Sequence, residues 1–123
     1  MRYRLRHQQG FTLIELLVVI IILGILLAIA VPSYLKFRDR ANKSAAEANV
    51  RAAVPGMEAF NADHSTGYTG ATLTKLQGSY DAGIKNIKIS LANSTTYCIV
   101  NTSPGTVFYH KSGPGADIKL GHC

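Results

Sequence analysis

The stretch FTLIELLVVIIILGILLAIAV, residues 11–31, decides the fold. It is an apolar run in which Glu15 is the one charged side chain. As an α-helix it is about 31 Å long, enough to span the hydrocarbon core of a bilayer. A secretory signal peptide has a shorter apolar core, about 7–15 residues, followed by a cleavage site of small residues. Ala28 and Ala30 are similar to such a site, but cleavage there would remove a run of full spanning length. The run therefore predicts a transmembrane or lipid-facing helix.

Length and composition narrow the class of protein. The chain has 123 residues, enough for one domain, and its 47% hydrophobic and 16% charged residues exclude intrinsic disorder. Two cysteines are too few for a disulfide-dense scaffold. The formal net charge is +6, and Arg2, Arg4 and Arg6 supply half of it. The basic character is therefore largely a feature of the N-terminal leader, followed by a weakly basic domain.

The flanks of the apolar run leave its orientation nearly undecided. Basic residues lie on both sides, namely Arg2, Arg4 and Arg6 before it and Lys36, Arg38, Arg40 and Lys43 after it. Cys98 and Cys123 both lie in the C-terminal domain, and a disulfide there would need an oxidising compartment. We therefore expect the N terminus inside the cell and the domain outside.

Glu15 is the anomaly of the run. A carboxylate at the centre of a spanning helix costs roughly 2.5–3.5 kcal/mol, and less near an end. One interpretation is a side chain near the helix start that reaches the headgroups and is favoured by the helix dipole. The other is a carboxylate kept for a partner cation. The run alone leaves both open.

The junction between leader and run carries a composite motif, QGFTLIEL at residues 9–16. A short basic leader, Gly10, an aromatic Phe11 and Glu15 at the fifth position after Gly10 occur together. This resembles the class III signal of the type IV pilin-like superfamily, and Gly24, Pro32 and Tyr34 also fall at positions typical of pilins. The resemblance is strong over residues 10–34 and weaker over the rest of the first helix.

The resemblance implies a processing pathway. A prepilin peptidase would cut between Gly10 and Phe11 and N-methylate the new Phe11 amine, so that the leader, residues 1–10, is removed. Gly10 would let an extended backbone approach the enzyme closely. Glu15 would pair with the N-terminal amine of a neighbouring subunit, or with that of its own chain four residues away. Such a pair sets the register of a filament core.

Residues 11–32 would then form a helix that lies first in the cytoplasmic membrane, single-pass, and later in the core of an extracellular helical homopolymer. The resemblance also implies a pilus assembly platform and its ATPase as partners. Gly24 and Ala28 offer a small-residue patch for close helix packing, or merely lower the hydrophobicity. Pro32 lacks an N–H and should kink or loosen the helix, and in assembled pili we expect loosening between Gly24 and Pro32.

Residues 33–62 continue the helix in an amphipathic form. Small and aromatic residues recur at three- and four-residue steps, which predicts a buried stripe: Tyr34, Phe37, Ala41, Ala45, Ala48, Ala52 and Ala59 or Phe60. Pro55-Gly56 should kink or end the helix. The basic cluster at 36–43 is a solvated helix face or a contact with anionic lipid or acidic neighbours, with DNA capture as a third interpretation.

Residues 63–123 read as a globular head. A Gly- and Thr-rich loop is expected over 63–83, an antiparallel sheet over 84–111 with strands at 86–91, 95–101 and 106–111, and a disulfide-bounded tail over 112–123. The fold class is thus α+β, a long N-terminal helix packed on a small antiparallel β-meander. A Cys98–Cys123 bridge would pin the tail to the sheet, whereas two free thiols would suit a reducing compartment.

No catalytic constellation is visible, so we expect no enzyme, no cofactor and no metal. Asp63 and His64 lack a third ligand nearby and are expected to be solvated loop residues. The leading hypothesis is a type IV pilin that serves adhesion, motility or DNA uptake, its DNA or surface ligand unknown. The alternative is a pseudopilin of type II secretion or competence, although the tail offers only Asp117 for the calcium loop usual in secretion pseudopilins. A membrane-anchored binding module is a further rival, but it would need neither Gly10 nor Glu15.

Overall fold

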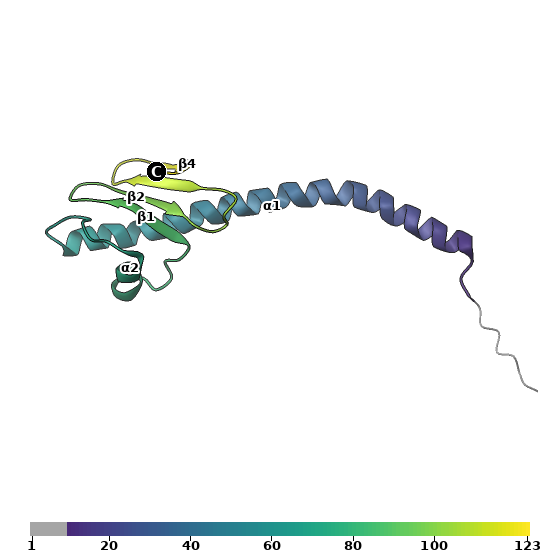
Figure 1. The fold of residues 1–123 in the computed structure, drawn as a ribbon, viewed down its shortest axis with the longest axis horizontal. Helices are drawn as coiled ribbons and strands as arrows, with labels where there is room; N and C mark the ends of the chain where they lie inside the picture. Colours follow the sequence, from purple (N-terminus) through teal and green to yellow (C-terminus); the bar gives the residue numbers. More distant parts are fainter. Residues whose placement is uncertain (1–9) are drawn as a thin grey trace, which may run out of the picture. The chain divides into compact units, whose positions relative to one another are not determined.

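The computed structural model describes residues 10–123 and contains two helices and four strands (Figure 1). Helix α1 covers Leu13–Asp63 and α2 covers Leu73–Ser79. The strands are β1 (Ile87–Ala92), β2 (Tyr97–Asn101), β3 (Tyr109–Gly113) and β4 (Ile118–Leu120). The chain divides into two compact units after Phe37.

Helix α1 is continuous through both of its prolines. The sequence left open whether Pro55-Gly56 kinks or ends the helix, and the structure excludes an end, because α1 continues to Asp63. A proline removes one backbone donor from the ladder, a loss that packing of the following turn can offset. Gly56 is buried against the head, and a Cβ there would lie 2.6 Å from Cδ1 of Ile84. The small residue thus lets the helix approach the core closely.

The buried face of α1 differs from the predicted stripe. Five apolar side chains at helical spacing are buried: Ala46, Val50, Ala53, Met57 and Phe60. Of the predicted stripe only Phe60 is among them, whereas Ala41, Ala45, Ala48 and Ala52 are exposed. The prediction was wrong because alanines mark two stripes of this helix equally well. The larger side chains Val50, Met57 and Phe60 identify the stripe that packs on the sheet.

The segment 63–83 contains helix α2, where the sequence predicted only a loop. Thr72 caps this helix, since its Oγ1 accepts a hydrogen bond from the backbone N–H of Lys75 at 3.3 Å. Leu76 is fully buried and anchors α2 to the core. The signal in the sequence was a threonine cap with an apolar pair, Leu73 and Leu76, three residues apart.

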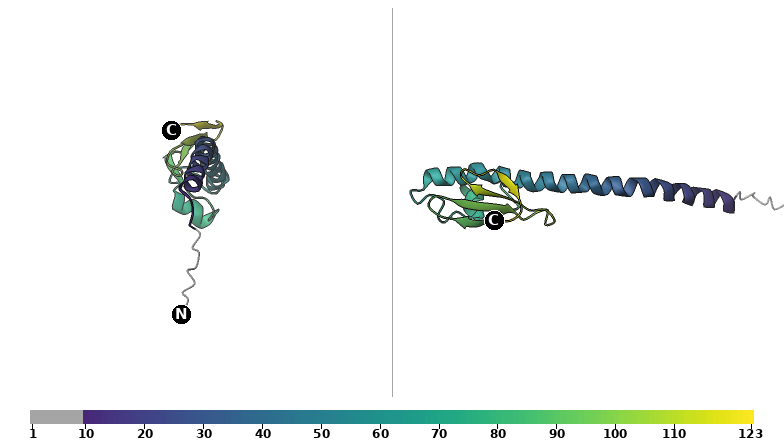
Figure 2. Two further views of the ribbon diagram at one scale, coloured as in Figure 1. Left: turned by 90° about the vertical axis from the view of Figure 1, so that its right-hand side faces the viewer. Right: turned by 90° about the horizontal axis from the view of Figure 1, so that it is seen from above.

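The sheet is an antiparallel meander in the order β1-β2-β3-β4 (Figure 2). The alternating pattern of the sequence predicted this type of sheet. It extends beyond the expected 84–111, because β4 forms within the predicted tail. The third strand begins at Tyr109 rather than at 106. The buried Asn101 explains this, since its amide donates to the carbonyl of Val107 at 2.7 Å and its oxygen accepts from the N–H of Tyr109 at 2.6 Å. The side chain of Asn101 thus replaces part of the ladder.

The core of the head lies between residues 46–60 of α1 and the face of the sheet that carries Ile87 and Ile99. Two buried tyrosines connect these layers to Glu58. The hydroxyl of Tyr68 donates to Oε2 of Glu58 at 3.0 Å, and that of Tyr97 donates to Oε1 at 3.4 Å. Burial, followed by the negative charge of Glu58, raises the pKa of Tyr97.

Candidate processing and assembly site

The first turn of α1 is closed by a reciprocal pair of hydrogen bonds. Thr12 precedes the helix, and its Oγ1 accepts from the N–H of Glu15 at 3.3 Å. The Oε2 of Glu15 in turn accepts from the N–H of Thr12 at 3.3 Å. This is a capping box, which satisfies two backbone donors that the helix start would otherwise leave unpaired. The box was not predicted, although the spacing Thr-x-x-Glu before an apolar run is its signature in the sequence.

The box fixes where the carboxylate of Glu15 lies. Together with Phe11, Leu16 and Val19 it lines an open hollow of about 510 Å³ on the first unit. Phe11 is 88% exposed, four residues before Glu15. A carboxylate held at a helix N-terminus among apolar side chains is suited to pairing with a cation, because its one hydrogen bond to the N–H of Thr12 does not neutralise its charge.

The backbone around the predicted cleavage point is open. Gly10 and Phe11 precede α1 and belong to no helix or strand. Both residues are exposed, and a Cβ built on Gly10 would meet no atom within 4 Å. An enzyme could therefore reach this bond without unfolding α1. The predicted basic leader with Arg2, Arg4 and Arg6 lies outside the described residues, apart from Gly10.

The apolar run of α1 has no partner within its own unit. Within residues 10–123, α1 is the one helix long and apolar enough to cross a membrane. The large apolar side chains between Leu13 and Val31 are exposed without exception. Covering so many of them requires lipid or other protein, since monomeric soluble proteins rarely expose apolar patches of this size.

Gly24 and Pro32 lie inside the uninterrupted helix α1. Pro32 lacks a backbone donor, and one residue later Oγ of Ser33 donates to the carbonyl of Ile29 at 3.3 Å. No side chain lies within 4 Å of the position of a Cβ on Gly24, so another helix could approach there. The kink or loosening over 24–32 stays a prediction for the assembled state.

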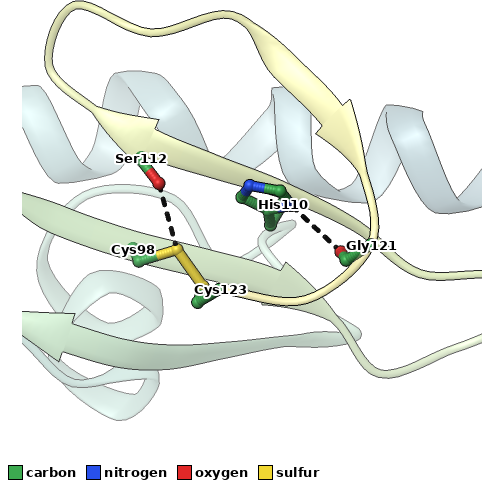
Figure 3. The surroundings of a disulfide bond; sticks show 5 residues. All are labelled: Cys98, His110, Ser112, Gly121 and Cys123. Carbon is green, nitrogen blue, oxygen red and sulfur yellow. Dashed lines mark hydrogen bonds between the residues drawn. A yellow bond between two sulfur atoms is a disulfide. The ribbon is translucent and has the colours of Figure 1, made fainter.

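The predicted disulfide is present. Cys98 in β2 and Cys123 are bridged, with their Cα atoms 6.1 Å apart, and Figure 3 shows the bond on the face of the sheet away from α1. The tail is held at further points. The N–H of Gly121 donates to the carbonyl of Phe108 at 2.7 Å, and Nδ1 of His110 donates to the carbonyl of Gly121 at 3.0 Å.

Asp63 and His64 end α1 rather than form a site. Nδ1 of His64 bonds the carbonyl of Phe60 at 2.9 Å, and its ring stacks on that of Phe60 at 3.9 Å between centroids. These contacts satisfy the C-terminal turn of the helix. Across residues 10–123, no group of three or more His, Cys, Asp or Glu side chains is arranged to hold a metal ion.

The chain is similar to known proteins both over its first helix and over most of its length. A family model, the prokaryotic N-terminal methylation motif, matches residues 5–31. The chain is 34% identical over 108 residues to the type IV wide pilus major component PilA4 of Thermus thermophilus, covering 85% of this chain and 82% of that protein.

Two further relatives match shorter stretches. Competence protein ComGC of Halalkalibacterium halodurans is 35% identical over 78 residues, which is 63% of this chain and 76% of that protein. The type II secretion system core protein G of Pseudomonas aeruginosa is 39% identical over 59 residues, 48% of this chain and 42% of that protein. The motif at residues 9–16, the single long helix and the similarity that extends through the head agree: the chain belongs to the type IV pilin family.

Proposed function

We propose that the chain is a structural subunit of a type IV pilus, which polymerises into a surface filament. The similarity to PilA4 of Thermus thermophilus carries this proposal, because it extends over 85% of the chain and so includes the head as well as the first helix. A protein that shared only the export signal would match over the first helix alone. The filament would serve adhesion, motility or DNA uptake.

Processing by a prepilin peptidase is the first step of the proposal. The enzyme cuts between Gly10 and Phe11 and methylates the Phe11 amine. The exposed, non-helical backbone at these two residues supports this assignment, as does the match to the N-terminal methylation motif. The cut creates a cationic amine four residues before the Glu15 carboxylate.

Assembly follows from that new charge. The Glu15 carboxylate pairs with the Phe11 amine of a neighbouring subunit, in an apolar filament core where either charge alone would be costly. Before assembly, the run from Leu13 to Val31 spans the cytoplasmic membrane, with the N terminus inside and the disulfide-bonded head outside. An assembly platform and its ATPase extract the subunit from the membrane.

The alternative is a subunit of a competence or type II secretion pseudopilus. The similarity to ComGC, which covers 76% of that protein, favours it specifically. The match to core protein G covers 42% of that protein, so it says less about the head. The length of the filament on cells separates a pilus from a pseudopilus.

The test is electron microscopy of filaments sheared from cells, combined with intact-mass measurement of their subunit. The proposal expects long filaments whose subunit begins at N-methyl-Phe11. Gly10→Val provides the control, because the folded chain has room for a side chain at residue 10 and only the peptidase should reject it. Retention of Met1 in assembled filaments, or cleavage after Ala30, would refute the proposed processing.

A further inference from the structure

Positive charge is unevenly distributed over the second unit, residues 38–123. Residues 38–83 carry five basic and five acidic side chains, which sum to zero: Arg38, Arg40, Lys43, Arg51 and Lys75 against Asp39, Glu47, Glu58, Asp63 and Asp81. Residues 84–123 carry four lysines and one acid, 4 − 1 = +3: Lys85, Lys88, Lys111 and Lys119 against Asp117. The whole excess charge of residues 38–123 therefore lies in their sheet half, residues 84–123.

Pairing between the strands aligns part of this charge. Lys88 of β1 lies opposite Val100, Val100 opposite His110, and His110 opposite Lys119 of β4. Side chains at paired positions point to the same face of a sheet, and these alternate with Ile87 and Ile99, which face the core. We call Lys88, His110 and Lys119 the outer row. It spans three strand spacings, about 14 Å.

Of the remaining charges of this half, Lys111 and Asp117 lie on the other face, and Lys85 precedes β1. Lys111 and Asp117 line an open hollow of about 550 Å³ together with Glu47 and Arg51 of α1. Nζ of Lys111 donates to the carbonyl of Ala116 at 2.5 Å. The ion pair found within residues 10–123 joins Arg51 to Glu47. The lysines of the outer row thus lack an acidic side chain within ion-pair distance in the described part of the chain.

The tail fixes the surroundings of the outer row. Because Nδ1 of His110 is bonded to Gly121, its Nε2 remains as the free polar atom of the ring (Figure 3). The disulfide holds the tail on this face, and the ring of His122 packs on that of Phe108 at 4.1 Å. The Phe108–His122 ring pair and the outer row therefore lie on the part of the head that the disulfide holds.

We propose that the outer row binds the phosphate backbone of nucleic acid. A linear polymer of single negative charges attracts the row's two lysines, which have no acidic side chain of residues 10–123 within ion-pair distance, and Nε2 of His110 offers a further polar atom between them. Two lysines give only weak binding to one subunit. Repetition along a filament raises the overall affinity by about 10²–10⁴. The inference rests on the proposed filament for this gain.

The experiment measures binding of a short duplex DNA of random sequence to sheared filaments between about 50 and 200 mM salt. Wild-type filaments should bind, with an affinity that falls steeply with salt. In the Lys88→Gln/Lys119→Gln variant the affinity at the lowest salt should drop on the order of 10- to 100-fold. The slope of log affinity against log salt should decrease by about 2 for each engaged subunit. The single variants should each show part of the loss.

Lys75→Gln is the matched control, since it removes one positive charge from exposed α2 and should leave binding nearly unchanged. Wild-type affinity and salt slope in the double variant would overturn the proposal. So would binding of heparin, a sulfated polysaccharide, by filaments that do not bind the duplex.

A second format separates this inference from the proposed function. The full chain is reconstituted at high density in neutral phosphatidylcholine vesicles, where the heads are crowded without a filament. Lysine-dependent duplex binding there supports the outer row even if cells produce no filaments. Loss of filaments alone would refute the proposed function and leave the vesicle result to decide the nucleic-acid site.

Discussion

Thr12 and Glu15 exchange two hydrogen bonds across the first turn of α1, each 3.3 Å long. The same carboxylate therefore closes the first turn and, under the proposed processing, would lie four residues after the amine that cleavage after Gly10 creates. A glutamate in this position has two separable properties, the acceptor oxygen that closes the turn and the negative charge that attracts a cation.

Substitutions of Glu15 can separate these properties. Glutamine is also a capping-box residue, so Glu15→Gln should keep the helix start while it removes the charge. Glu15→Leu removes both the acceptor oxygen and the charge. We expect both variants to insert into the membrane and to be cleaved. We expect both to form far less filament than the wild type. Filament yield, measured by shearing and immunoblotting, checks this.

Thr12→Ala is the complementary variant, because it removes one bond of the box and keeps the charge. It should retain more assembly than Glu15→Gln. Normal filament yield from Glu15→Gln would contradict the charge-pairing role and would leave capping as the function of this residue.

The sequence was sufficient to predict the features that depend on composition and spacing. The apolar run, the motif around Gly10 and the alternating strands each have a pattern that few other structures share. The antiparallel meander and the Cys98–Cys123 bridge were confirmed. The face of α1 that packs on the head was not predicted correctly, because Ala46 and Ala53 on the buried side resemble Ala45 and Ala52 on the exposed side.

Short elements were missed for a different reason. Helix α2 and strand β4 contain few residues, and tertiary contacts stabilise them more than local propensity does. β4 exists because it pairs with β3 while the bridge at Cys123 holds the chain that follows. The start of β3 depends on the side chain of Asn101, a contact that no periodicity records.

Removal of the disulfide should destabilise the head. The bridge joins residues 25 positions apart, and closing such a loop contributes about 3–4 kcal/mol in the chain-entropy model. Cys98→Ser/Cys123→Ser should therefore lower the free energy of unfolding by about that amount. Urea unfolding of the full chain in neutral detergent, with and without reductant, measures it. Reductant should weaken the wild type and leave the variant unaffected, and equal midpoints throughout would contradict the prediction.

Alkaline pH should destabilise the head through its buried tyrosines. Burial raises the pKa of Tyr97 and of Tyr68 above their ordinary value of 10.0, so above pH 10 the folded chain binds more protons than the unfolded chain. This contribution is complete below about pH 10 and is lost as the pH rises from there toward the higher folded pKa.

The measurement is the urea midpoint between about pH 8 and pH 11. Tyr97→Phe should flatten the alkaline decline, at the cost of its hydrogen bond to Glu58, whereas Tyr34→Phe on the exposed helix is the matched control. An unchanged decline in Tyr97→Phe would show that other groups cause it.

The substitution Gly113→Ala, which adds a single methyl group, should disturb the contact between β3 and the core. A Cβ there would lie 2.1 Å from two ring carbons of Tyr97, a fully buried side chain that also bonds Glu58. Overpacking of this kind costs about 1–3 kcal/mol, and the ring cannot move without giving up its hydrogen bond. Gly115→Ala is the matched control in the next turn, because its Cβ would meet no atom within 4 Å. Thermal unfolding should therefore separate the two variants, and equal stability would mean that the Tyr97 ring has room to shift.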